Sequence, residues 1–249
     1  MAYKPLEHKF RITSYDVDCD MNLAVDKLLG YMQDTALRQT NEMSIGLEYL
    51  GQRNFFWALS KILVRISRMP KWDEEITVRT WARPHDIFTQ PREFEIEDSA
   101  GSVIVRATSS WIILDGATGK FLKLEQFDER LHYLENKVAI DGTAPKIRKP
   151  DFDTAPSAFF KVRRSDLDWN HHVNNTKYIQ WLFDSEEFAN VCTSSLAEIS
   201  VNYVSQTRLG EEYSIQTKET EAGTRVSDLI AKEGNREICR IETKFKTLA

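Results

Sequence analysis

Several features that define specialised protein classes are scarce or missing from this chain of 249 residues. Its three cysteines are an odd number without a C-x-x-C spacing, which argues against a disulfide framework and against a structural zinc site. No stretch approaches the roughly 20 apolar residues that span a bilayer. Residues 1–10 also lack the apolar core of a secretory signal peptide. We therefore expect a cytoplasmic protein without a membrane span.

The motifs of several enzyme classes are absent as well. The chain has no G-x-S-x-G elbow, no P-loop, no G-x-G-x-x-G and no H-E-x-x-H motif, so we expect neither a metal nor an organic cofactor. A net charge of -5 argues against an extended nucleic-acid-binding face. The composition, 41% hydrophobic and 29% charged, is that of an ordinary globular protein with two modest domains or one large one.

What the chain does contain is one structural unit written twice. A shift of 150 residues aligns Phe10 with Phe160, Asp16 with Asp166, Asp18 with Asp168, Lys27 with Lys177 and Asp34 with Asp184. Each copy opens with a short alternating segment that predicts a half-buried strand, followed by an Asp-rich loop and a helix. The helices show apolar stripes at Leu28, Tyr31, Met32 and Thr35 and at Tyr178, Trp181, Leu182 and Ser185.

Four strand-like stretches follow each predicted helix. They are residues 55–66, 75–82, 90–97 and 102–114 in the first copy, and 198–204, 213–219, 225–233 and 237–247 in the second. One helix followed by a meander of long strands predicts an α+β fold with an antiparallel sheet around the helix. Three prolines mark residues 135–156 as a linker between an N-terminal domain, 1–134, and a C-terminal domain, 157–249.

The densest group of polar side chains lies just before the second helix. Residues 165–175 (SDLDWNHHVNN) carry two carboxylates, three amides and two imidazoles, and the corresponding stretch of the first copy has no imidazole. A histidine with a pKa near 6.5 can take a proton from water, while amides and carboxylates can orient that water. Asn174 and Asn175 are candidate N-caps, and free N–H groups at the helix start could stabilise an oxyanion.

Residues 167–181 (LDWNHHVNNTKYIQW) resemble the signature of the acyl-acyl carrier protein (ACP) thioesterases of plants and bacteria, and the resemblance extends over about residues 5–247. It implies a double (tandem) hotdog fold with two long helices packed on a joined antiparallel sheet. It also implies that the thioester of fatty acyl-ACP is hydrolysed in fatty acid biosynthesis by water, without a Ser or Cys nucleophile. The catalytic groups would then lie in the C-terminal hotdog.

Carried over residue by residue, the resemblance implies that Asp168, Asn170 and His172 are catalytic. An acidic residue of the plant enzymes falls on Gln206, which is a departure because an amide is a poor base, and their neighbouring Cys falls on Thr207. The first hotdog would shape the acyl pocket; the residues expected to contact substrate are Leu28, Met32, Trp57 and Asn175. Simpler roles stay open, since Asp168 matches Asp18 and could cap its loop, and His172 could be an ordinary loop histidine.

An acyl carrier protein is acidic, so docking would require a local positive patch. The residues expected to form it are Arg163, Arg164, Lys149 and Lys177. Because a fused second hotdog can replace a partner subunit, we expect a monomer or a homodimer. Three alternatives remain open at this point: an acyl-CoA thioesterase, a non-catalytic acyl-binding protein and a hotdog dehydratase.

Overall fold

The computed structural model describes residues 3–152 and 158–246. The chain forms two compact units, unit 1 (Met1–Ala144) and unit 2 (Pro145–Ala249). The boundary between them falls inside the segment predicted as the linker. The last part of that segment and the first residue of the predicted C-terminal domain, residues 153–157, lie outside the described residues.

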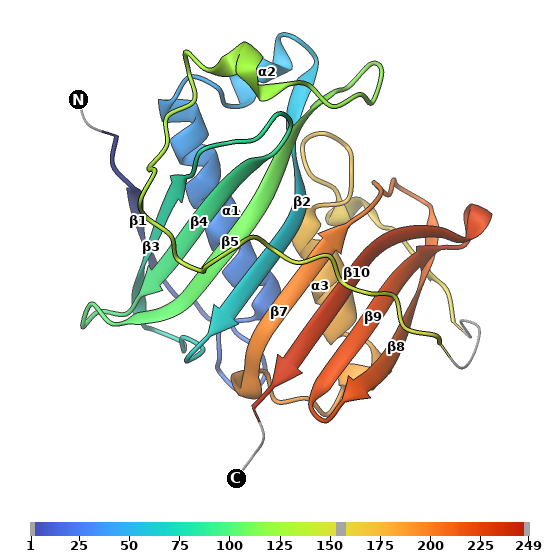
Figure 1. Ribbon diagram of the computed structural model, residues 1–249. Coiled ribbons are helices and arrows are strands. Elements are labelled where there is room, and N and C mark those ends of the chain that lie inside the picture. Colours follow the sequence, from blue (N-terminus) through green and yellow to red (C-terminus); the bar gives the residue numbers. More distant parts are fainter. Residues whose placement is uncertain (1–2, 153–157, 247–249) are drawn as a thin grey trace. The chain divides into compact units, whose positions relative to one another are not determined.

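Unit 1 is a five-stranded antiparallel sheet with a long helix against one face (Figure 1). Its elements are β1 (Leu6–Arg11), α1 (Val25–Glu42), α2 (Leu47–Gly51), β2 (Phe55–Ile66), β3 (Glu75–Ala82), β4 (Gln90–Glu97), β5 (Val103–Asp115) and a 3-10 turn, Leu124–Phe127. The strand order is β1-β3-β4-β5-β2. The apolar stripe predicted for the helix is buried at Leu28 and Met32, so α1 covers the sheet with the expected side.

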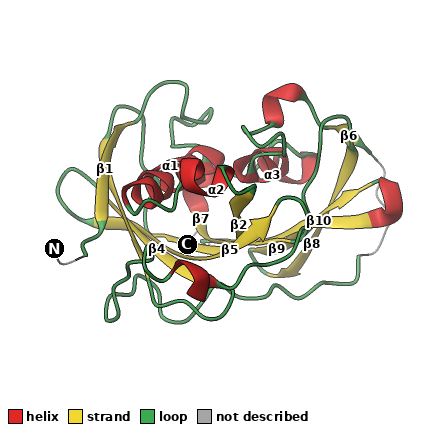
Figure 2. Ribbon diagram, turned by 90° about the horizontal axis from the view of Figure 1, so that it is seen from above, coloured by secondary structure: helices red, strands yellow, loops and turns green. Residues whose placement is uncertain are grey.

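Unit 2 repeats this plan with the strand order β7-β10-β9-β8-β6 and α3 against one face of the sheet (Figure 2). Its elements are β6 (Phe160–Lys161), α3 (Asn175–Phe183), β7 (Leu196–Tyr203), β8 (Glu212–Glu221), β9 (Thr224–Ala231) and β10 (Arg236–Phe245), with four 3-10 turns, Arg164–Asp166, Glu186–Phe188, Thr193–Ser195 and Glu233–Asn235. The predicted α+β class, with an antiparallel sheet in each copy, is confirmed.

The two helices differ in length, which corrects the expectation of two long helices. The 150-residue shift aligns their first residues, Val25 and Asn175, but α1 has 18 residues and α3 only nine. Beyond Phe183 the hydroxyl of Ser185 donates to the carbonyl of Leu182 at 2.7 Å, and a 3-10 turn follows. The aligned residue of α1, Thr35, also donates its hydroxyl to the backbone, at Tyr31, and α1 continues beyond it.

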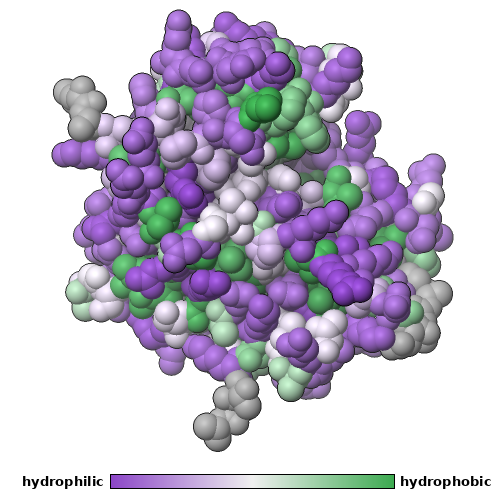
Figure 3. All heavy atoms as spheres, in the orientation of Figure 1, coloured by the Kyte–Doolittle hydropathy of each residue, from purple (hydrophilic) through white to green (hydrophobic). Residues whose placement is uncertain are grey.

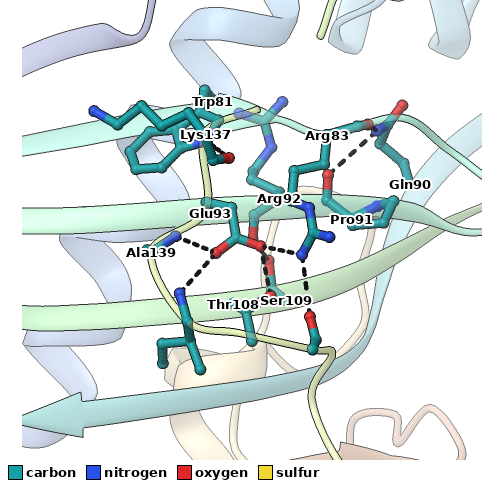
Figure 4. A network of polar contacts seen from close by, with 12 residues as sticks. Trp81, Arg83, Gln90, Pro91, Arg92, Glu93, Thr108, Ser109, Lys137 and Ala139 are labelled. Atoms are coloured by element: carbon teal, nitrogen blue, oxygen red, sulfur yellow. Dashed lines mark hydrogen bonds and ion pairs between the residues drawn. The ribbon is translucent and has the colours of Figure 1, made fainter. Parts of the chain in front are cut away.

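The segment predicted as a linker is held against the sheets. It runs across the sheet face opposite the helices, and the side chains on this face are mostly hydrophilic (Figures 1 and 3). In unit 1 the Glu93 carboxylate on β4 is completely buried and accepts from the N–H groups of Ala139 and Ile140, at 3.0 and 3.4 Å. Arg83 and Thr108 donate to its other oxygen, at 3.2 and 2.8 Å (Figure 4).

Unit 2 holds its part of the segment with a similar arrangement. Asp228 on β9, also completely buried, pairs with Arg240, whose guanidinium donates to the carbonyl of Ile147 at 3.3 Å. The N–H of Ile147 in turn donates to Asn202 at 2.8 Å. Each unit therefore uses a buried carboxylate on the strand β4 or β9 to fix the chain outside its sheet.

Two general features complete the description. The three cysteines are free thiols, with Cys239 buried and Cys19 and Cys192 exposed. None of the helices in the described ranges is long and apolar enough to cross a membrane.

The role of Glu93 can be tested by urea denaturation of the Glu93→Ala variant. The substitution leaves the N–H groups of Ala139 and Ile140 without their acceptor and removes the ion pair of the half-buried Arg83, so we expect the free energy of unfolding to fall by about 3 kcal/mol. Glu129→Ala is the matched control, because Glu129 is exposed and a change there should alter stability by less than about 0.5 kcal/mol. Equal stabilities of the two variants would show that Glu93 does not anchor the linker.

Candidate active site

The polar loop before α3 is closed by the carboxylate of Asp168. Its Oδ1 accepts from the N–H of Asn170 at 2.8 Å and from the N–H of His172 at 3.2 Å. The N–H of Asp168 donates to the carbonyl of His172 at 2.8 Å. Between them His171 takes a left-handed conformation with φ 61°. Asp168 thus sets the path of the backbone that carries His172.

The first copy builds the same loop without a histidine. Asp18 Oδ1 accepts from the N–H groups of Asp20 and Asn22, both at 2.9 Å, and Met21 has φ 63°. Asp168 therefore caps its loop in the same way as Asp18 does. The two copies share one backbone design and differ in what stands at the fifth position, Asn22 or His172.

The start of α3 is capped by a side chain, as predicted for Asn174. Its Oδ1 accepts from the N–H and the hydroxyl of Thr176, both at 3.0 Å, whereas Ala24 at the start of α1 offers no side-chain cap. The cap therefore occupies the N–H of Thr176, one of the groups at the helix start that were expected to be free. Within residues 3–152 and 158–246, the N–H of Asn175 makes no hydrogen bond and remains available to a ligand.

A second loop, which follows β7, packs against the first. The carbonyl of Thr207, a completely buried residue, accepts from the N–H of Val173 at 3.0 Å. The hydroxyl of Tyr203 donates to the carbonyl of Asn175 at 3.3 Å. Gln206 is exposed in this loop, and its carbonyl accepts from Arg236 at 2.8 Å. Gln206 thus lies one residue before Thr207, whose carbonyl contacts the histidine loop.

The partial burial of His172 favours the neutral form of its ring. Partial burial lowers the pKa of His172 below its ordinary value of 6.5, and the positive charges of Arg208 and His171 lower it further, while Asp168 opposes them. A neutral imidazole is the form that can accept a proton. Arg208 was not among the predicted site residues, and the one signal for it in the sequence is its position two residues after Gln206.

The remaining predicted residues are distributed over both units. Asn170 and the ring of His171 are exposed beside His172. In unit 1 Leu28 and Met32 are buried in the core, and Trp57 is half-buried and donates to the carbonyl of Ile45 at 3.1 Å. Their predicted contact with substrate stays a prediction.

The four basic residues predicted to form one patch lie on two faces of unit 2. Arg163 and Arg164 are exposed before the histidine loop, and Lys177 on α3 donates to Gln180 at 2.7 Å. Lys149 instead lies 3.9 Å from Asp228, in the segment that crosses the sheet face away from α3 (Figure 1). That all four residues form one docking patch stays a prediction.

Comparisons with known proteins agree on one group. The model of the acyl-ACP thioesterase N-terminal domain matches residues 4–127, and that of the C-terminal domain matches residues 151–247. The acyl-[acyl-carrier-protein] hydrolase FATB1, chloroplastic, of Cuphea viscosissima is 26% identical over 208 residues, which cover 79% of this chain and 50% of that protein. The chain therefore spans about half the length of such relatives.

Solved structures show the same fold. The 12:0-ACP thioesterase from Umbellularia californica superposes with a TM-score of 0.84 at 21% identity, covering 97% of both chains. An acyl-ACP thioesterase from Bacteroides thetaiotaomicron gives a TM-score of 0.77 at 22% identity, covering 96% of this chain and 97% of the other. At these identities the similarity shows the fold alone.

The electrostatics of the histidine loop can be measured by NMR titration of the His172 ring. We expect its midpoint below 6.5, and we expect Arg208→Gln to move the midpoint up because a positive neighbour is removed. Asp168→Asn should move it down, since the opposing carboxylate is lost. If the titration midpoint of the His172 ring is the same in both variants as in the wild type, Arg208 and Asp168 do not act on His172 as described.

Proposed function

The chain belongs to the acyl-ACP thioesterase family, and on that premise we propose that it hydrolyses the thioester of fatty acyl-ACP to a free fatty acid and the carrier thiol. The observation that carries the proposal is that two loops with the same backbone hydrogen bonds differ in whether they carry a histidine. Asp18 and Asp168 make the same contacts, yet only the second loop presents an imidazole, and it does so beside an open N–H at a helix start. A purely structural loop would not need this difference.

The chemistry follows from the groups present. A thioester is already activated, so its hydrolysis needs a positioned water, a proton acceptor and a donor for the developing oxyanion. His172, with its lowered pKa, is largely neutral at pH 7 and takes the proton as water attacks the carbonyl carbon. The C–S bond then breaks, and the imidazolium returns the proton to the thiolate of the carrier.

Two further groups complete this account. The N–H of Asn175 lies at the positive end of α3 and stabilises the oxyanion, and the exposed amide of Asn170 holds the water or the carbonyl. Asp168 acts through the backbone of its loop and through its charge. Gln206 stays the candidate for the position of the plant acid; it can orient water but cannot accept its proton at neutral pH.

The partner in this proposal is acyl carrier protein. Arg163, Arg164 and Lys177 stand around the histidine loop, with Arg208 on the loop beside it, and they provide positive charge for an acidic carrier. Lys149, the fourth residue predicted for docking, lies beside Asp228. The monomeric or dimeric state and a cytoplasmic location stay predictions that size-exclusion chromatography and cell fractionation can test.

The role of His172 is tested by the His172→Asn variant, which places in the second loop the residue that the first loop carries at Asn22. The loop accepts asparagine at this position, so the fold should persist, while loss of the base should lower kcat on acyl-ACP about 10²- to 10⁴-fold. The matched control is His171→Asn, which tolerates the left-handed backbone and should stay active. A His172→Asn variant with wild-type kcat would exclude His172 as the base. If the wild-type protein hydrolyses neither acyl-ACP nor acyl-CoA, the alternative of a non-catalytic acyl-binding protein is favoured.

The choice between carriers is tested by reversing charges beside the loop. Arg163→Glu combined with Arg164→Glu should raise KM for acyl-ACP about tenfold through like-charge repulsion and leave acyl-CoA hydrolysis nearly unchanged. The control pair, Lys146→Glu with Arg148→Glu, carries the same charge change on the linker. A higher kcat/KM for acyl-CoA than for acyl-ACP would identify the protein as an acyl-CoA thioesterase. An equal KM for acyl-ACP in the two double variants would exclude docking at Arg163 and Arg164.

A further inference from the structure

Unit 1 contains a cavity that the proposed reaction does not use. Its volume of about 520 Å³ lies in the range of small-molecule sites. Four of the residues that line it carry a phenol or an imidazole ring, one carries a carboxylate and two are apolar. They are Tyr3, His85, His132 and Tyr133, then Asp128, and finally Pro84 and Leu131. Among the described residues, no lysine or arginine lines this cavity.

The walls of the cavity come from three segments of unit 1 that hydrogen bonds hold together. The N–H of Ala82, at the end of β3, donates to the hydroxyl of Tyr3 at 3.1 Å, and the carbonyl of Ala82 accepts from the N–H of Leu134 at 2.9 Å. The loop after β3 is joined to the segment after β5 by the N–H of Leu124, which donates to the carbonyl of Ile87 at 2.9 Å. These bonds fix the walls without a ligand, which lowers the cost of binding one.

His85 holds the carboxylate of Asp128 at one end of the cavity. Its Nε2 lies 2.9 Å from Asp128 Oδ1, and its Nδ1 lies 2.8 Å from the carbonyl oxygen of Asp86. The ring of Tyr133 meets the ring of His85 at 86°, with 6.5 Å between their centroids. Within residues 3–152 and 158–246, the second carboxylate oxygen of Asp128 makes no hydrogen bond. This end of the cavity therefore offers a ligand an aromatic ring beside an open carboxylate oxygen.

The other end of the cavity is formed by Tyr3 and His132, whose ring centroids lie 6.2 Å apart at an angle of 39°. Burial raises the pKa of Tyr3, and the positive charge of the buried Arg92 opposes this. Arg92 does not line the cavity, but it lies close enough to make the Tyr3 end unfavourable for a second positive charge. A cationic ligand would therefore place its charge at the Asp128 end and its neutral part beside Tyr3 and His132.

The duplication shows that the fold does not require the loop that carries His85. In unit 2 the strands β8 and β9 take the places of β3 and β4, and residues 222–223 are enough to join them. In unit 1 residues 83–89 join β3 to β4, and Pro84 and His85 lie in this longer loop. The loop that positions Asp128 is therefore an addition to a scaffold that forms its sheet without it.

We propose that this cavity of unit 1 is a binding site for a small organic cation with a methylated ammonium group. The carboxylate of Asp128 would stabilise the charge, and the ring of Tyr133 would contact the methyl groups in a cation–π interaction. An anion is disfavoured, because the carboxylate is the one lining group with a full charge when the imidazoles are neutral. A methylated ammonium is favoured over a primary one, since it loses less hydration when it enters an aromatic site. This inference does not depend on the hydrolase activity, for which the histidine loop of unit 2 is proposed.

Calorimetric titration of the full chain with choline and with 3,3-dimethylbutan-1-ol, which has the shape of choline without its charge, tests the proposal. The wild-type protein should bind choline about fivefold more tightly than the alcohol. Asp128→Asn keeps the shape of the side chain and should lower the affinity for choline about threefold while leaving that for the alcohol unchanged. Tyr133→Leu removes the ring and should also lower the affinity for choline about threefold.

Two matched controls make the same changes at exposed residues of unit 1 that do not line the cavity. They are Asp141→Asn and Tyr15→Leu, the latter at a side chain that is 89% exposed. Both control variants should bind choline like the wild type.

Three results would overturn the proposal. They are a wild type that binds choline no more tightly than the alcohol, choline binding that is unchanged in Asp128→Asn and Tyr133→Leu, and choline binding that is lost in His172→Asn. If Tyr133→Leu does not fold, Tyr133→Phe keeps the ring without the hydroxyl and should bind choline like the wild type, and a loss of binding there would count against the cation–π contact. Acyl-ACP hydrolysis by the same wild-type preparation reports separately on the proposed function.

Discussion

The geometry of the candidate site depends on a single carboxylate that holds the backbone around it. Asp168 accepts from the N–H groups of residues two and four positions later, which closes the loop and fixes the left-handed turn at His171. The following N–H groups are taken by Asp166, Thr207 and the Asn174 cap, so the path from the strand to α3 has little freedom. The backbone that carries the imidazole is therefore held in one conformation.

The duplicated fold separates what the scaffold needs from what each copy adds. Both copies keep the aspartate-closed loop and a buried carboxylate on the fourth strand that holds the chain outside the sheet. Unit 2 adds the imidazole and a capped helix start. Unit 1 adds two and a half turns to its helix and a longer loop beside a cavity. Because the shared parts already satisfy the backbone, we assign the histidine loop and the cavity to ligands.

The sequence predicted most of the backbone, since the signals it rests on are local. Alternating burial and turn residues placed β2 to β5 and β7 to β10 within two residues of their ends, and Asn174 was recognisable as an N-cap. Three features were beyond such signals. They are the end of α3 at Phe183, the position of Lys149 beside Asp228, and the effect of Arg208 on His172. Each depends on how segments distant in the sequence pack together, and the pattern of residues within one segment does not show this.

The most direct test of the central claim is the dependence of kcat/KM on pH for acyl-ACP hydrolysis by the wild-type protein. A base must be neutral to act, so the rate should fall as pH decreases through the pKa of His172, which lies below 6.5 in the free protein. The account predicts one acidic limb below pH 6.5 that coincides with the titration midpoint of the His172 ring. A limb above 6.5, or a rate that stays constant across the titration of that ring, would contradict it.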